Sequence, residues 1–157
     1  LGRPSLQDGV DLDVVLGMVL ANLDTVIKEA GATVTSDPLP TLTAARTEMV
    51  QLFQNLIGNA VKFRRDGVPP VVVVTCRDEG DHWAFSVRDN GIGMDEQYSA
   101  KVFTPFKRLH DRSKYAGSGI GLAVAQKIVH RYGGRIRFNS VPGGGTTFHF
   151  TILKHMR

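Results

Sequence analysis

Two glycine-rich turns restrict the fold of this chain more than any other feature. They read Asp-Asn-Gly-Ile-Gly-Met at 89–94 and Gly-Ser-Gly-Ile-Gly-Leu at 117–122. The second turn runs into an apolar-periodic stretch, which predicts a helix over Ile120 to Arg131. Glycines at a helix start leave N–H groups unpaired at the positive end of the helix dipole, where a phosphate binds well.

The first turn carries a carboxylate. Asp89 follows the alternating run Trp83 to Val87, so its side chain is predicted at a strand end, where it can accept a hydrogen bond from an amino group. A carboxylate acceptor at one end of a cleft and phosphate-binding N–H groups at the other are what an adenine nucleotide requires. The segment between the two turns is expected to be mobile.

Composition indicates one α/β domain with a sizeable core. The 157 residues are 42% hydrophobic and 22% charged, and no apolar run approaches the roughly 20 residues of a membrane span. No signal peptide is visible, and the chain begins at Leu1, so we expect a cytoplasmic piece of a longer protein. Cys76 is the one cysteine, which excludes a disulfide framework within the chain and favours a reducing compartment.

The net charge of +4 raises the question of a nucleic-acid partner. The basic residues are dispersed over several segments, and their densest group, Lys101 to Lys114, lies between the two glycine turns. There the positive charge would serve a nucleotide. We therefore expect neither a nucleic-acid partner nor membrane contact by this domain.

Hydrophobic periodicity predicts an α/β two-layer sandwich. Three main helices are expected on one face of a mixed, mainly antiparallel sheet of about five strands. The predicted helices cover 12–30, 46–63 and 120–131, with a short one near 95–102, and the predicted strands cover 32–35, 71–77, 82–89, 135–141 and 146–153. Residues 1–11 are expected as a residual linker and 12–157 as the domain.

The second predicted helix carries Asn55, Asn59 and Lys62 on one side. Asparagine is a poor residue inside a helix, because its amide competes for backbone hydrogen bonds. One interpretation is that an amide oxygen ligates Mg²⁺ and the lysine meets phosphate oxygens. The alternative is that both amides bond to neighbouring loops and Lys62 is solvated.

Other site types fit poorly. The second glycine turn lacks the lysine of a Gly-x-x-x-x-Gly-Lys-Ser/Thr loop and does not follow a strand as a dinucleotide fingerprint does. The five histidines lie on different elements without ligand spacing, and no nucleophile elbow for a hydrolytic triad is present. Phe103-Thr-Pro-Phe106, followed by Lys107 and Arg108, predicts either anchors of a lid with cations that close on phosphates, or a small satellite core with a solvated basic edge.

The motifs occur in a fixed order along the chain. They are Asn55-Leu-Ile-Gly-Asn59-Ala-Val-Lys62-Phe63, Asp89 to Met94, Phe103 to Arg108, Gly117 to Leu122, and Gly144-Gly-Thr146. This set resembles the N box, first glycine box, F box, second glycine box and terminal Gly-Thr element of the catalytic and ATP-binding domain of bacterial sensor histidine kinases. The stretch Arg108 to Tyr115 is similar to phytochrome-type kinases. The wider superfamily, with gyrase B, Hsp90 and MutL, implies the Bergerat ATP-binding fold.

The resemblance implies a role for each matching residue. At the adenine end, Asp89 accepts the amino group with Thr146 nearby through water, Gly91 and Gly93 allow close approach of the backbone, and Ile92 and Phe63 line the pocket. At the phosphate end it implies Mg²⁺ ligation by Asn59, with Asn55, Lys62 and Arg108 as catalytic residues near the phosphates of ATP. The cradle for those phosphates consists of Gly117, Ser118, Gly119, Gly121 and Leu122, and Met94 to Ala116 is the ATP lid.

The resemblance also implies partners. The phosphorylated histidine of the family lies on a separate dimerisation and phosphoacceptor domain, which this chain lacks, and a response regulator receives the phosphoryl group. We therefore expect a homodimer in the full-length protein, and an isolated chain that binds ATP but turns over little. One departure is Ala45, since many relatives carry an aspartate there that caps the helix.

Two rival interpretations stay open. A gyrase-like or chaperone-like ATPase would share the fold, but such proteins usually carry glutamate where Asn55 stands. A nucleotide-sensing module without catalysis would share the motifs.

Overall fold

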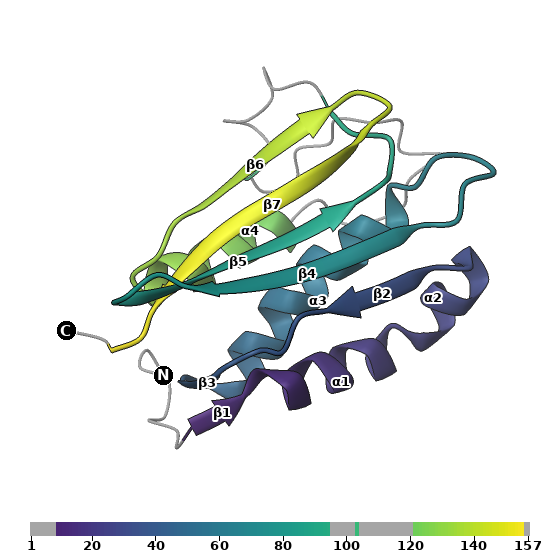
Figure 1. The fold of residues 1–157 in the computed structure, drawn as a ribbon. Coiled ribbons are helices and arrows are strands. Elements are labelled where there is room, and N and C mark those ends of the chain that lie inside the picture. Colours follow the sequence, from purple (N-terminus) through teal and green to yellow (C-terminus); the bar gives the residue numbers. More distant parts are fainter. Residues whose placement is uncertain (1–8, 95–102, 104–120, 156–157) are drawn as a thin grey trace.

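The computed structural model of the protein describes residues 9–94, 103 and 121–155, and a five-stranded sheet forms one of its layers (Figure 1). The strands lie in the order β2-β4-β5-β7-β6, and β2 pairs with β4 in parallel while the other neighbours are antiparallel. Their bounds are β2 Thr33–Ser36, β4 Val71–Asp78, β5 His82–Asp89, β6 Ile136–Val141 and β7 Gly145–Leu153. The predicted mixed, mainly antiparallel sheet is therefore confirmed.

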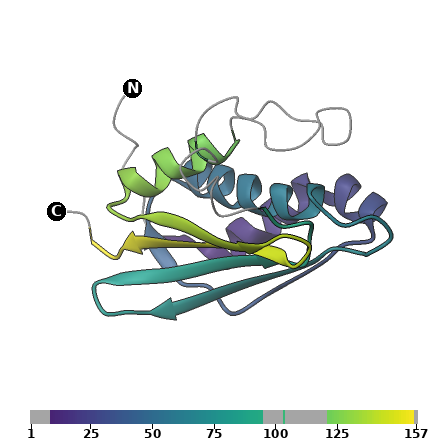
Figure 2. The ribbon, with the colours of Figure 1, turned by 90° about the horizontal axis from the view of Figure 1, so that it is seen from above.

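The helices cover one face of this sheet, which gives two layers (Figure 2). Their bounds are α1 Leu12–Asn22, α2 Asp24–Ala30, α3 Arg46–Lys62 and α4 Gly121–Arg131. Phe53 of α3 packs edge-on against Phe85 of β5 and Phe150 of β7, with ring centroids 5.8 and 5.6 Å apart. Because alternate residues of β7 are buried, the sheet presents an apolar face to the helices, as the predicted sandwich requires.

The prediction of one continuous helix over 12–30 was wrong, because the chain leaves helical geometry at Leu23. Two contacts with α3 accompany the break. The Asn22 amide donates to the Gln54 side-chain oxygen at 3.0 Å, and the Leu23 side chain lies 3.9 Å from where a Cβ on Gly58 would stand. Both contacts join segments far apart in sequence, so helical periodicity could not reveal them. The described part of the chain thus has four helices where three were expected.

A small two-stranded sheet precedes α3 and was not predicted. It consists of β1 (Gly9–Asp11) and β3 (Thr41–Thr43), paired antiparallel. Strands of three residues are too short to show alternation. Part of the range expected as linker, 1–11, therefore forms a strand.

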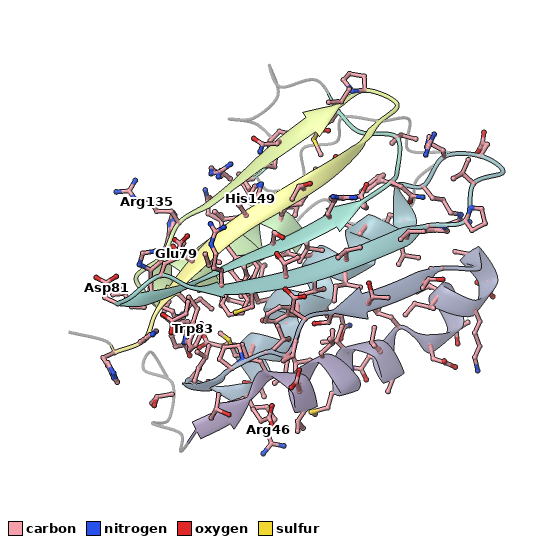
Figure 3. The ribbon with its side chains drawn as sticks, viewed as in Figure 1. Arg46, Glu79, Asp81, Trp83, Arg135 and His149 are labelled. Carbon is pink, nitrogen blue, oxygen red and sulfur yellow. The ribbon has the colours of Figure 1, made fainter. Side chains whose placement is uncertain are left out.

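The sheet face away from the helices is polar, and Figure 3 shows Arg135 and His149 on it. Arg88 and Arg137 project from the same face, since their strand neighbours point into the core. Within the described residues, none of these three arginines forms an ion pair. Positive charge that is dispersed in the sequence is thus partly gathered on this surface.

Candidate nucleotide-binding site

Asp89, the last residue of β5, is a half-buried carboxylate with one oxygen already bonded. Its Oδ1 accepts hydrogen bonds from the backbone N–H of Gly91 at 2.8 Å and of Thr146 at 3.2 Å. Burial raises the pKa of Asp89 to about 6, although both N–H donors act in the opposite direction. Oδ2 has no hydrogen-bond partner in the described part of the chain, so it is available to an amino group.

The first glycine turn lies directly against the end of α3. A Cβ on Gly91 would stand 2.2 Å from the carbonyl oxygen of Phe63, closer than any side-chain atom can approach. The same carbonyl accepts the N–H of Ile92 at 3.0 Å. Glycine at 91 is therefore required by this contact, which joins α3 to the turn that follows β5.

The other side of the turn contacts the hairpin between β6 and β7. Gly93 has φ +70°, and a Cβ there would stand 2.0 Å from the Val141 carbonyl oxygen. The carbonyl of Ile92 accepts the N–H of Gly143 at 2.6 Å, and the N–H of Met94 donates to the Ser140 hydroxyl at 2.7 Å. The turn is thus held from two sides.

Thr146 belongs to the same corner and is 5% exposed. Its hydroxyl lies 2.8 Å from that of Ser140, which also donates to the Gly145 carbonyl at 3.1 Å. Phe63 and Ile92, joined by the backbone hydrogen bond described above, are both half-buried. The structure therefore brings together the residues that the sequence analysis assigned to an adenine pocket, while their roles in binding stay predictions.

Asn55, Asn59 and Lys62 lie on α3, where a helix was predicted, and all three are half-buried. The Asn55 amide donates to the backbone carbonyl of Gly121, the first residue of α4, at 3.0 Å. This contact is of the kind that the alternative interpretation expected, and it fixes the last glycine of the second glycine turn against α3. The Asn59 side chain has no hydrogen-bond partner in the described ranges, and the Lys62 ammonium lies 5.5 Å from the Phe63 ring centroid.

Helix α3 therefore connects the two ends of the candidate site. Its residue 55 contacts the start of α4, and Phe63, just beyond its end, contacts the first glycine turn. Eight residues of α-helix span about 12 Å. Asn59 and Lys62 lie between these two contacts, so one helix lines an extended site.

Several predicted residues lie outside the described residues: Arg108, Gly117, Ser118 and Gly119, with the predicted helix at 95–102 and most of the lid range Met94 to Ala116. Leu122 is described and half-buried on α4. Phe103 is described as well, and its ring packs edge-on against Phe148 at 6.2 Å between centroids. This packing on the core is what an anchor at the lid would need.

Asn90 is part of the site corner and was missed in the sequence analysis. Its Oδ1 accepts the Val71 N–H at 2.8 Å, its amide donates to the Pro69 carbonyl at 3.2 Å, and its own carbonyl accepts from Arg65 at 2.9 Å. These bonds hold the loop between α3 and β4 against the first glycine turn. An Asn-Gly pair after a strand is a turn signal that could have indicated it.

Two negative findings concern the described ranges only. Among them, no group of three or more His, Cys, Asp or Glu side chains lies close enough together to hold a metal ion. None of the described helices combines the length and the hydropathy needed to cross a bilayer.

Comparisons with known proteins agree on one family. The model of the histidine kinase-, DNA gyrase B- and HSP90-like ATPase family matches residues 44–156. Cyanobacterial phytochrome A of Nostoc sp. is 49% identical over 142 residues, which are 90% of this chain and 18% of that protein. Phytochrome-like protein Cph1 of Synechocystis sp. is 42% identical over 90% of this chain and 19% of its own length. The chain thus spans about a fifth of these relatives.

Solved structures give the same fold. Full-length ShkA in complex with AMPPNP matches with a TM-score of 0.80 and 28% identity, over 99% of this chain and 33% of that one. The mycobacterial sensor histidine kinase MprB matches with a TM-score of 0.79 and 23% identity, over 97% of this chain and all of that one. The fold class predicted from the sequence is confirmed by these neighbours.

Proposed function

Because this chain belongs to the histidine kinase-, DNA gyrase B- and HSP90-like ATPase family, with phytochromes among its relatives, we propose that it is the ATP-binding catalytic domain of a sensor histidine kinase. Its activity is transfer of the γ-phosphoryl group of ATP to a histidine on a separate phosphoacceptor domain. The observation that carries the proposal is Asp89, whose Oδ2 has no partner among the described residues and stands at a corner built from two glycine-dependent contacts.

At the adenine end, Asp89 Oδ2 accepts the 6-amino group of the base. The N–H groups of Gly91 and Thr146 keep Oδ1 occupied, which leaves Oδ2 to face the ligand. Ile92 and Phe63 supply apolar surface to the ring, and Gly91 and Gly93 keep the backbone close to it. Thr146 contributes through water next to Asp89.

At the phosphate end, the residues of α3 fit a magnesium nucleotide. Amide oxygens are ligands that Mg²⁺ accepts, and the Asn59 side chain has no partner within the described chain. Lys62 and Arg108 offset negative charge on the phosphates, and Gly117, Ser118, Gly119, Gly121 and Leu122 cradle them at the start of α4. The magnesium nucleotide supplies the phosphoryl group, and the chain acts by positioning and electrostatics.

The group that removes a proton from the acceptor histidine does not belong to this chain. Asn55 donates a hydrogen bond from its amide N–H to the Gly121 carbonyl and stands beside the phosphates. An amide does not take up a proton, so Asn55 is not a general base. We assign no general base within the chain. An acidic group next to the acceptor histidine fits that role better.

The proposed partners follow from the reaction. They are the protein's own dimerisation and phosphoacceptor domain and a response-regulator receiver domain, with a homodimer in the full-length protein and a cytoplasmic location for this domain. Residues 12–157 form the catalytic unit, whose lid is Met94 to Ala116. Alone, the unit binds ATP but turns over little.

The rival ATPase function would need a residue that activates water. Asn55, with its amide directed to Gly121, is unsuited to it. A nucleotide-sensing module is the second rival, and phosphoryl transfer separates it from a kinase.

The adenine assignment is tested by Asp89→Asn. The asparagine side chain has one carbonyl oxygen and one NH2 group in place of the two carboxylate oxygens. Its NH2 group therefore faces either the adenine amino group or the two backbone N–H groups, and in both cases donor meets donor. We expect Mg-ATP affinity to fall by about 1–3 kcal/mol in calorimetry, the cost of an unsatisfied buried partner. Asp24→Asn, the same change at an exposed position of α2, is the control and leaves affinity unchanged. Equal affinities of wild type and Asp89→Asn would refute the assignment.

The kinase assignment is tested by adding the phosphoacceptor domain of the full-length protein and ATP labelled in the γ-phosphate. We expect acid-labile label on a histidine of the added domain, and almost none when either component is omitted. If ATP binds but label never reaches a histidine, the sensing function replaces the kinase function.

A further inference from the structure

The start of α3 lacks the side-chain cap that helices commonly have. Its N-cap residue is Ala45, and no side chain at 45 bonds to the first turn. The backbone N–H of Ala45 instead donates to the Tyr132 hydroxyl at 3.0 Å, and that hydroxyl donates to the Glu48 carboxylate at 2.6 Å. In a capping box, the acid three residues into the helix accepts the N-cap N–H directly. Here the hydroxyl of Tyr132, the residue after α4, bridges the N–H of Ala45 and the carboxylate of Glu48.

The tyrosine is held firmly in this position. Tyr132 is 5% exposed, and its backbone carbonyl accepts the N–H of Leu153 of β7 at 3.1 Å. Arg131 lies 3.2 Å from the second Glu48 oxygen, which orients that carboxylate. Burial, and then the bond to Glu48, raises the pKa of Tyr132 to about 12, so the hydroxyl keeps its proton at neutral pH.

A second contact joins the other end of α4 to the middle of α3. The Asn55 amide bonds to the carbonyl of Gly121, where α4 begins. Residues 45 to 55 of the one segment and 121 to 132 of the other each span about 15–17 Å of helix. Helix α4 is therefore tied at both of its ends to the first part of α3, over matched lengths.

We propose that Tyr132 is a positioning residue for the nucleotide site, because its hydroxyl fixes how α4 lies along α3. The inference rests on the proposed function, in which α3 carries Asn59 and Lys62 and the start of α4 receives phosphates. With the Tyr132 tie removed, the described contacts that still hold α4 to α3 are the Asn55 bond, the Arg131–Glu48 ion pair and apolar packing. The phosphate-binding start of α4 is then less well placed against α3.

The experiment is Tyr132→Phe, studied by calorimetry with ADP and Mg²⁺ and by thermal unfolding. The variant keeps the buried ring and loses the tie. We expect a lower Tm and a dissociation constant raised about three- to tenfold, as for the loss of one hydrogen bond of the network. A stability loss by itself does not weaken binding while the unliganded protein stays folded, so the two readouts are independent.

A second variant separates capping from positioning. Ala45→Ser in the Tyr132→Phe background restores a local cap for α3 but no link to α4. We expect its Tm to recover while the dissociation constant stays raised. Val15→Ala, which opens a cavity at a buried position of α1, is the control that lowers Tm without weakening binding.

Two outcomes would overturn the inference: an unchanged dissociation constant in Tyr132→Phe, or recovery of both Tm and affinity with Ala45→Ser. If the unmodified chain itself fails to bind ADP, the proposed function falls, and this inference falls with it. Binding by the unmodified chain with normal binding by Tyr132→Phe leaves the proposed function standing and refutes the positioning role alone.

Discussion

At the residue scale, the protonation of Asp89 controls which groups it can bind. Its Oδ1 accepts two backbone N–H groups, so a proton taken up by this carboxylate goes to Oδ2. Burial has raised the pKa of Asp89 to about 6, so this proton is taken up near physiological pH. The oxygen that faces the adenine amino group changes from acceptor to donor when this happens.

This gives a pH dependence of binding. We expect adenine nucleotide affinity to be full above about pH 6 and to fall towards tenfold per pH unit below it, because protonated Asp89 must first lose its proton. Calorimetry with Mg-ADP across this range measures it. Asp89→Asn is the control, since the titration of the nucleotide's own phosphate is common to both proteins. The same slope in both would contradict the assignment.

At the element scale, the turn after β5 is held by backbone contacts that leave no space for a side chain at 91. The sequence placed β5 at His82–Asp89, and the structure agrees, because a clear turn at 78–81 and an alternating run define it. What the turn contacts could not be predicted. The Phe63 and Val141 carbonyls, from two other elements, press against Gly91 and Gly93.

Two glycine substitutions should therefore have opposite effects. Gly91→Ala places a Cβ 2.2 Å from the Phe63 carbonyl oxygen, and we expect it to lower the free energy of unfolding by about 1–3 kcal/mol. Gly17→Ala on exposed α1 meets nothing within 4 Å and should raise it by about 0.5–1 kcal/mol. Urea denaturation measures both. A loss of equal size at the two positions would show that the contact at 91 does not constrain the fold.

At the scale of the whole molecule, burial of the ionised Asp89 carboxylate lowers the free energy of unfolding. Its folded pKa of about 6 lies above the ordinary aspartate pKa of 3.8, so the folded state binds more protons than the unfolded state between these values. The free energy of unfolding therefore falls as pH rises through this window. The contribution is on the order of 3 kcal/mol and is constant above it.

We expect the free energy of unfolding of wild type and of Asp89→Asn to depend differently on pH. Wild type should lose stability from about pH 4 to about pH 6 relative to Asp89→Asn, which has no carboxylate to ionise. Urea unfolding of both across this range gives the difference, and other titrating groups, such as Asp78 and Glu79 with their lowered pKa values, cancel. A constant difference would mean that Asp89 is not buried as described.

Patterns among residues a few positions apart in the sequence determined most helices and strands of this protein. Alternation gave β5, β6 and β7, and a run of β-branched residues gave β4. Helical spacing gave α3 and α4, and the order of glycine and asparagine motifs indicated the family. These signals are strong because they depend on residues a few positions apart. Where an element is short, as in β1 and β3, or bends, as between α1 and α2, the local signal was too weak or misleading.

Tertiary structure alone decided how the site is held. Thr146 reaches Asp89 across 57 residues, and Tyr132 reaches Ala45 across 87. Neither bond follows from periodicity, because each depends on how β5 and β7 pair and how α4 packs along α3. The missing aspartate at 45 looked like a weakness in the sequence, yet in the fold a hydroxyl from a distant segment joins the backbone N–H of Ala45 to Glu48 of the first helical turn. Local preference decides which segments become helices and strands, and packing decides which of their polar groups meet.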